Sequence, residues 1–149
     1  MIYLSQRDLK WAKEKLGQSN LTIGRWGCTT TCVSMVSDYF GCYRSPIDLA
    51  HDAANYTNDG LILWWKLHFL KMKFSSRVRL RNDASIQESL KNPNGAVILE
   101  VNDGQHWVVA LRRAYVGNDY LVLDPWTGKK CWVIKTYRNI TGSAHFKRL

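Results

Sequence analysis

Four β-rich runs in the C-terminal half of the chain constrain its fold more than any other feature of the sequence. They are GAVILEV (95–101), HWVVALRRAY (106–115), DYLVLD (119–124) and KCWVIKTY (130–137). The short segments NDGQ and VGND, which separate the first three runs, have the composition of hairpin turns. We therefore expect the C-terminal half to form an antiparallel sheet.

The N-terminal half carries helical patterns instead. Apolar residues after Cys28 recur at helical spacing until Gly41, and Ser45 followed by Pro46 is typical of a helix start. Further helices are predicted over 5–17, 60–72 and 84–92. Helices followed by strands predict an α+β fold, in which N-terminal helices pack on a C-terminal antiparallel sheet. At this length we expect one domain, residues 1–149.

The chain is strongly basic, with a formal net charge of +9 at pH 7. The basic residues are densest between Lys66 and Arg81 and in the C-terminal tail. This charge predicts electrostatic contact with a polyanion, either nucleic acid, an anionic membrane surface or the acidic polymers of a bacterial wall. The alternative is a solvated basic face that has no partner.

The N-terminal residues lack the basic start, apolar core and cleavage site of a signal peptide. No apolar run reaches the roughly 18–20 residues that a membrane-spanning helix needs. We therefore expect a protein without a membrane span that is synthesised in the cytoplasm. The four cysteines are then expected to be free thiols rather than disulfides.

Cys28 and Cys32 lie four residues apart at the start of the predicted helix. A helix N-terminus stabilises a thiolate through free N–H groups and the positive end of the helix dipole, which favours Cys28 as a nucleophile. Cys32, one turn further, is expected to be a core residue. No second ligand cluster completes a zinc site, and the spacing differs from that of a redox pair. We expect no metal and no cofactor.

A cysteine nucleophile also needs a base and a residue that orients the base. His106 begins one predicted strand, and Asp124 ends the next strand. If these strands pair through the turn near Gly117, residues 106–112 lie opposite roughly 123–129. This hairpin geometry places Asp124 close to His106.

Three segments carry a resemblance to a known family. They are Cys28 with Met35 and the following DYFG, His106-Trp107-Val108-Val109, and Asp124-Pro125 with Gly128. In this order they resemble the papain-like cysteine peptidases of the bacteriocin-processing type, the double-glycine leader peptidase-like superfamily. The resemblance covers about three quarters of the chain. It implies a papain-like α+β fold and acyl transfer by a Cys–His–Asp triad of Cys28, His106 and Asp124.

The resemblance also implies a glutamine that precedes the nucleophile and donates a hydrogen bond to the oxyanion. Gln18 is the expected donor, although it lies further upstream than is usual, and the alternatives are Asn20 and the Cys28 backbone N–H. The chain also has Thr29 where the family usually has a glycine after the cysteine. Trp26 and Trp126, which flank Cys28 and Asp124 in sequence, are expected to wall the cleft and bind substrate.

The predicted function is hydrolysis of a peptide bond by a stand-alone cysteine peptidase or amidase. With the basic charge, the resemblance favours a phage or bacterial enzyme that cleaves the peptides of peptidoglycan after lysis or as a virion component. One alternative is a peptidase that processes a leader peptide or a host protein as a counter-defence factor. Another is a catalytically degenerate basic module that binds nucleic acid. The sequence does not set the oligomeric state.

Overall fold

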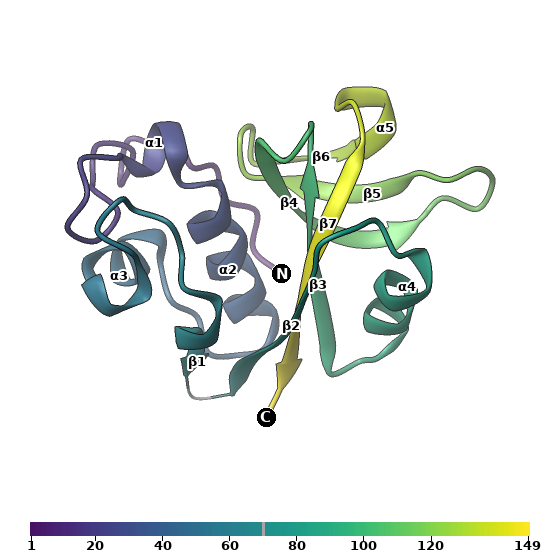
Figure 1. Ribbon diagram of the computed structural model, residues 1–149, viewed down its shortest axis with the longest axis horizontal. Helices are drawn as coiled ribbons and strands as arrows, with labels where there is room; N and C mark the ends of the chain where they lie inside the picture. The colour runs from purple at the N-terminus through teal and green to yellow at the C-terminus, as the bar shows by residue number, and fades with distance from the viewer. Residues whose placement is uncertain (70) are drawn as a thin grey trace.

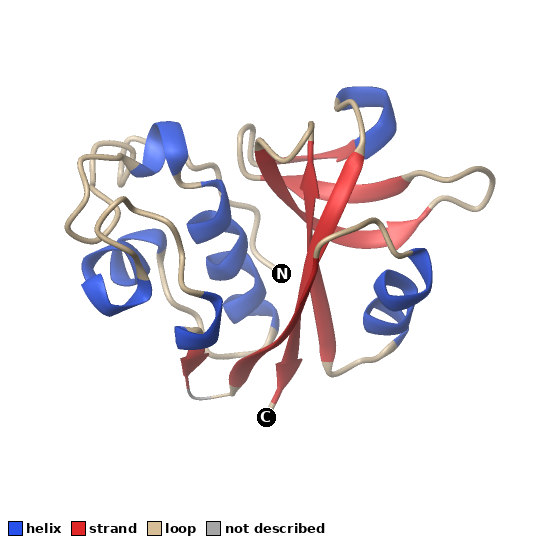
Figure 2. Ribbon diagram, viewed as in Figure 1, coloured by secondary structure: helices blue, strands red, loops and turns tan. Residues whose placement is uncertain are grey.

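The central feature of the computed structural model, which describes residues 1–69 and 71–149, is a seven-stranded sheet (Figures 1 and 2). In spatial order its strands are β1 (His68–Phe69), β2 (Met72–Val78), β7 (Ile140–Arg148), β3 (Gly95–Val101), β4 (His106–Arg113), β5 (Tyr120–Asp124) and β6 (Lys129–Trp132). All neighbouring strands are antiparallel. The predicted α+β fold, with N-terminal helices on an antiparallel sheet, is confirmed.

Helices cover both faces of the sheet, and this explains why its central strands are apolar almost without interruption. Along β3, Ala96 and Ile98 pack in the cluster that contains the buried side of α2 (Cys28–Tyr39). Val97 and Leu99 point to the other face and pack with Ile86 of α4 (Asp83–Lys91). Alternate residues of one strand therefore enter two different cores.

The remaining helices are short. They are α1 (Ile23–Trp26), α3 (Pro46–His51), α5 (Val133–Thr136) and the 3₁₀ turns η1 (Ala53–Asn55) and η2 (Trp64–Lys66). The helices predicted after Cys28, after Ser45 and over 84–92 are confirmed. At α3, Ser45 and Asp48 form a capping box, in which each side chain accepts a hydrogen bond from the backbone N–H of the other residue.

The helix predicted over 5–17 is wrong: local bonds form only separate turns there, and the start of the segment is bonded to a distant loop. The backbone N–H of Gln6 donates to the carbonyl of Pro125 at 2.7 Å, and the Ser5 hydroxyl donates to Trp126 O at 3.3 Å. Between Gln6 and Lys13 the chain forms consecutive turns. The predicted helix over 60–72 is also wrong: this segment holds η2, β1 and the first residue of β2, and its residue 70 lies outside the described part.

Two strands, β2 and β7, form from segments that the sequence marks only as basic. They pair antiparallel, with β7 next to β3. In β2 the exposed Lys73 follows the buried Met72, whereas in β7 the exposed Lys147 and Arg148 follow a run of buried residues, 142–146. Met72 is fully buried, and so are Ala144 and, almost completely, Phe146. The charge of both segments therefore hides a strand pattern. The last predicted run, 130–137, is a strand only as far as Trp132 and continues as α5.

His145 is a buried polar residue of β7, and its environment leads us to expect that the stability of the protein depends on pH. Its ring is bonded on both nitrogens, by the Ser89 hydroxyl at 2.7 Å and the Ser143 hydroxyl at 2.8 Å. Burial lowers the pKa of His145 below its ordinary value of 6.5, with the charge of Glu88 opposing this shift. Because the unfolded chain binds the proton more tightly, the free energy of unfolding should fall as the pH decreases below 6.5.

His145→Gln should reduce this pH dependence and cost about 1–3 kcal/mol at pH 7.5, because buried hydroxyls lose a partner. Urea unfolding at pH 7.5, 6.0 and 5.0 would measure both effects. The matched control is His68→Gln in exposed β1, which should keep the wild-type slope. An equal slope in wild type and His145→Gln would contradict the prediction.

Candidate active site

Cys28 is the first residue of α2 and is half-buried. Its sulfur therefore lies where the helix presents free N–H groups and the positive end of its dipole, as the sequence predicts. Gly27 separates α1 from α2, and no larger residue fits there. A Cβ atom on Gly27 would lie 2.6 Å from the carbonyl oxygen of Ile23. The sharp junction of the two helices thus fixes the position of the thiol.

His106 and Asp124 meet across the hairpin of β4 and β5. The strands pair in the expected sense, with Val109 opposite Leu123, and a bulge follows between Ala110 and Arg112. His106 Nε2 lies 2.8 Å from Asp124 Oδ1, and Asp124 is 2% exposed. The second ring nitrogen of His106, Nδ1, remains for the thiol of Cys28.

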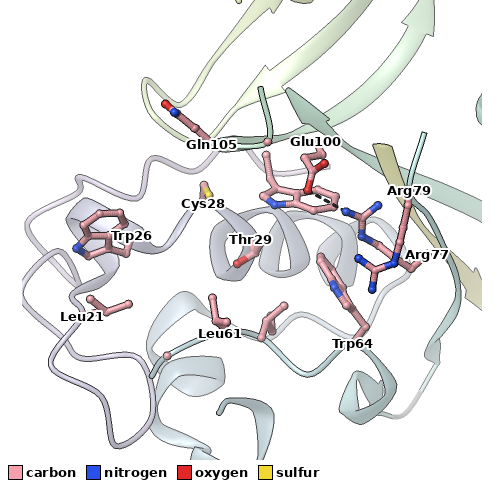
Figure 3. Close-up of a pocket in the computed structure, with 14 residues that line it drawn as sticks. Leu21, Trp26, Cys28, Thr29, Leu61, Trp64, Arg77, Arg79, Glu100 and Gln105 are labelled. Carbon is pink, nitrogen blue, oxygen red and sulfur yellow. Dashed lines mark hydrogen bonds and ion pairs between the residues drawn. The ribbon is translucent and has the colours of Figure 1, made fainter. Parts of the chain in front are cut away.

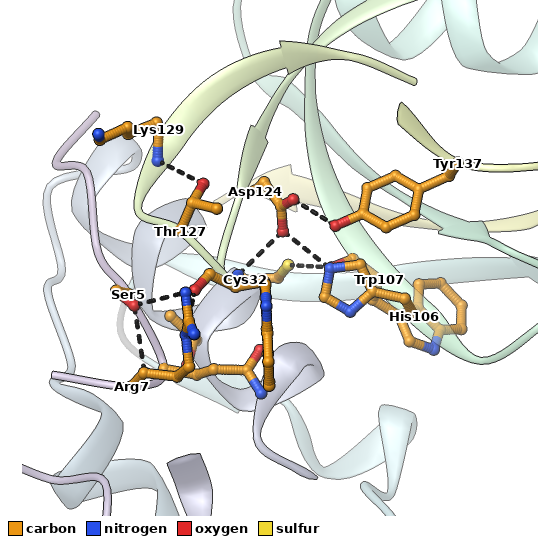
Figure 4. A network of polar contacts seen from close by, with 12 residues as sticks. Ser5, Arg7, Cys32, His106, Trp107, Asp124, Thr127, Lys129 and Tyr137 are labelled. Carbon is orange, nitrogen blue, oxygen red and sulfur yellow. Dashed lines mark hydrogen bonds and ion pairs between the residues drawn. The ribbon is translucent and has the colours of Figure 1, made fainter. Parts of the chain in front are cut away.

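Asp124 accepts hydrogen bonds from two further donors, which the sequence analysis did not identify (Figure 4). Its Oδ1 accepts from the backbone N–H of Trp126 at 2.9 Å, and its Oδ2 accepts from the hydroxyl of Tyr137. The rings of Tyr137 and His106 also lie 5.0 Å apart, centroid to centroid. Although burial of Asp124 opposes ionisation, the bonds from His106, Tyr137 and Trp126 keep its pKa below the ordinary value. Asp124 is thus a carboxylate at neutral pH.

The surroundings of His106 favour the imidazolium. Burial of the ring lowers its pKa, but hydrogen bonds with Asp124 and Cys28, and the charges of both groups, outweigh burial. Together they raise the pKa of His106 to about 9. His106 can therefore hold the proton that it takes from the Cys28 thiol, and a base of this kind beside the thiol is what activates a cysteine nucleophile.

A cavity of about 260 Å³ is lined by Cys28 and His106 and by Trp26 and Trp126, the two tryptophans that were expected to wall the cleft. Its lining comprises Gln6, Arg25, Trp26, Cys28, Asn102, Gln105, His106, Trp126 and Tyr137. Trp26 is 51% exposed and Trp126 is 40% exposed, so both rings stand partly free at its rim. The guanidinium of Arg7 stacks on Trp126 at 4.3 Å from the ring centroid.

Two glutamines, Gln6 and Gln105, line this cavity; Gln6 is the one that precedes Cys28 in the chain, and sequence analysis missed it. It is 1% exposed, its Nε2 donates to Gly24 O at 3.3 Å, and its buried Oε1 accepts no hydrogen bond within the described residues. The structure does not bring Gln18 or Asn20 to the site: both are exposed, and neither lines a cavity with Cys28. No local motif marks Gln6, because the contact of Gln6 with Pro125 is long-range.

Cys32 is a core residue, as predicted. It is fully buried, and its thiol donates to the carbonyl of Trp107 at 3.5 Å. Burial raises the pKa of Cys32, and the nearby Cys28 and Asp124 add to this shift. The Cys32 thiol therefore stays protonated while Cys28 lies at the cavity.

A family model described as the peptidase C39 family matches residues 25–137. Comparison with curated proteins and with solved structures found no match. The matched range includes Cys28, His106 and Asp124 and most of the sheet that positions them. In the described part of the chain, no helix has the length and apolar composition needed to span a membrane. Because the match covers three quarters of its length, the chain belongs to the peptidase C39 family and is a cysteine peptidase of papain-like α+β fold.

Proposed function

We propose that this peptidase cleaves peptide bonds with Cys28 as nucleophile, His106 as general base and acid, and Asp124 as the residue that orients His106. The observation that carries the proposal is that His106, which lines the same cavity as Cys28, is bonded through Nε2 to Oδ1 of the buried Asp124 at 2.8 Å. Nucleophile, base and orienting acid are the three groups that acyl transfer by a cysteine requires.

The reaction follows from these positions. His106 takes the proton of the Cys28 thiol, and the thiolate sulfur bonds to the carbonyl carbon of the substrate. The resulting oxyanion collapses, the C–N bond breaks, and the amine leaves with the proton from His106. Water, deprotonated by His106, then attacks the thioester and releases the acid with regeneration of the Cys28 thiol. Asp124 stabilises the imidazolium in both steps.

Gln6 and the backbone N–H of Cys28 are the proposed donors to the oxyanion. Gln6 is held by its backbone bond to Pro125, and its amide is buried in the wall of the cavity beside Cys28. A donor fixed before the reaction stabilises the developing charge without reorganisation. Thr29, which replaces the usual glycine, lines a different cavity that lies next to Cys28.

Gln6→Ala should lower kcat by about 10²–10³-fold, because the oxyanion loses one donor. Gln18→Ala, in the exposed turn, is the matched control and should keep the wild-type rate. Steady-state hydrolysis of a quenched fluorescent peptide measures kcat, and thermal unfolding monitors folding of the Gln6 variant. Equal activity of Gln6→Ala and wild type would exclude Gln6 as a donor.

We further propose that the substrate is the peptide part of bacterial peptidoglycan and that the enzyme is a stand-alone phage or bacterial lysin. The net charge of +9 supports this assignment, because it attracts the enzyme to an anionic wall. The test is digestion of purified peptidoglycan followed by mass analysis of the products. We expect digestion to release new amino and carboxyl termini. Added salt should lower the rate of digestion, because it screens the attraction between the enzyme and the wall. Intact peptidoglycan together with cleavage of leader or host proteins would overturn this assignment.

A further inference from the structure

A second cavity, of about 330 Å³, adjoins Cys28 (Figure 3). Its lining includes Cys28, Thr29, Trp26 and Gln105 but not His106. Cys28 and Trp26 thus lie on the boundary between two cavities, of which only the first contains His106. A substrate chain that crosses Cys28 would place one half in each cavity.

The position of His106 decides which half of the substrate each cavity receives. His106 gives its proton to the leaving amine, so the amine half must lie on the side of His106. The half that becomes the thioester, which lies N-terminal to the cleaved bond, then extends into the second cavity. Selectivity that resides in the second cavity is therefore selectivity for residues that precede the cleaved bond.

One wall of the second cavity is apolar, and its far end is basic. Leu21, Leu61, Ile62 and Trp64 supply apolar surface. Arg77, Arg79 and Glu100 lie at the end opposite Cys28, as Figure 3 shows. Two guanidinium groups and one carboxylate lie at this end, so it carries a net positive charge.

Arg77 is fully engaged within the protein. Its Nη2 donates to Glu100 Oε2 at 2.8 Å, its Nη1 donates to backbone carbonyls, and its guanidinium stacks 4.8 Å from the centroid of the Trp107 ring. Glu100 in turn accepts from the hydroxyl of Thr141 at 2.7 Å. The Arg77–Glu100 pair therefore closes the cavity and offers no free charge.

Arg79 is different. It directly follows the end of β2, its side chain is exposed, and within the described residues no acidic group forms an ion pair with it. Glu100, the one acidic residue in the lining, is already bonded to Arg77 and Thr141. An arginine at the end of an apolar cleft presents a planar donor that suits a carboxylate.

We propose that the second cavity is the subsite for the acyl half of the substrate and that Arg79 selects peptides with an acidic side chain N-terminal to the cleaved bond. This inference rests on the proposed function, because the direction of the chain follows from the role of His106. Apolar neighbours of the acidic residue would contact Leu61, Ile62 and Trp64.

Cleavage of a proteome-derived peptide library, read by mass spectrometry, tests the selectivity. Wild type should show Asp and Glu enriched at one position before the cleaved bond. For a peptide pair with Glu or Gln there, kcat/KM should favour Glu by about tenfold, as for a hydrogen bond to a charged group. In Arg79→Gln, kcat/KM for the Glu peptide should fall to that for the Gln peptide, which should be cleaved as by wild type. Arg79→Glu should instead prefer a peptide with Lys at that position. Lys73→Gln, which removes one charge from the exposed side of β2, should keep the ratio.

The outcomes separate this inference from the proposed function. An equal Glu-to-Gln ratio in wild type and Arg79→Gln, with cleavage retained, would overturn the subsite and leave the peptidase mechanism standing. Binding gives a second readout that needs no catalysis: the Cys28→Ala protein should bind the fluorescent Glu peptide more tightly than the Gln peptide. If Cys28→Ala/Arg79→Gln binds the Glu and Gln peptides equally, the subsite is supported even if wild type cleaves neither peptide. If the double variant still prefers the Glu peptide, the subsite is refuted.

Discussion

Cys28→Ala should abolish peptide hydrolysis, with a loss on the order of 10⁵-fold, because no other group can form the thioester. Cys32→Ala should retain activity. Cys32 is fully buried, its pKa is raised by burial, and its thiol is bonded to the carbonyl of Trp107. Its truncation should cost only stability, about 1 kcal/mol, as is common for a small core substitution.

A peptidyl chloromethyl ketone, followed by intact-mass and peptide mass analysis, measures the difference directly. Wild type and Cys32→Ala should each gain one adduct on Cys28, and Cys28→Ala should gain none. Thermal unfolding shows whether each variant is folded. Adducts on Cys32, or full hydrolysis by Cys28→Ala, would refute the assignment of the nucleophile.

The two cysteines and the histidine–aspartate pair were predictable because local patterns place them. A glycine-flanked helix start marks Cys28, and the hairpin between β4 and β5 brings His106 and Asp124 together. The bulge between Ala110 and Arg112 shifts the register without separating the two side chains. Strand pairing through a short turn depends on few long-range contacts, and this makes it readable from sequence.

Gln6 and Tyr137 could not be found in this way. Gln6 reaches the cavity because the N-terminal segment bonds to the loop after β5, and Tyr137 reaches Asp124 because α5 interrupts a run that looks like a strand. Both contacts join segments that have no shared sequence pattern. The strands β2 and β7 were missed for a related reason, since neither has a regular apolar alternation. Serines and basic residues interrupt β2, and β7 has Gly142, Ser143 and His145 at buried positions.

Asp124→Asn should lower kcat by up to about 10⁴-fold, because the amide neither stabilises the imidazolium nor fixes the required tautomer of His106. It should also change the pH dependence. In wild type, the pKa of about 9 predicts that kcat/KM falls as the pH rises through 9, where His106 loses the proton that the leaving amine needs. Without the carboxylate, this descending limb should move towards pH 6.5. Tyr137→Phe keeps the carboxylate and should leave the limb near 9, with a loss of about tenfold or less.

The stability of the same variants checks that the pH effect comes from His106. A histidine whose pKa is raised on folding stabilises the protein fully below pH 6.5, and this contribution disappears as the pH rises through about 9. Wild type should therefore lose stability between pH 7 and 9, whereas Asp124→Asn should lose less over this range. Urea unfolding at pH 6, 7.5 and 9 gives the comparison. If Asp124→Asn kept both the activity limb and the stability slope of wild type, the charge of Asp124 would not control His106, and the proposed triad would reduce to Cys28 and His106.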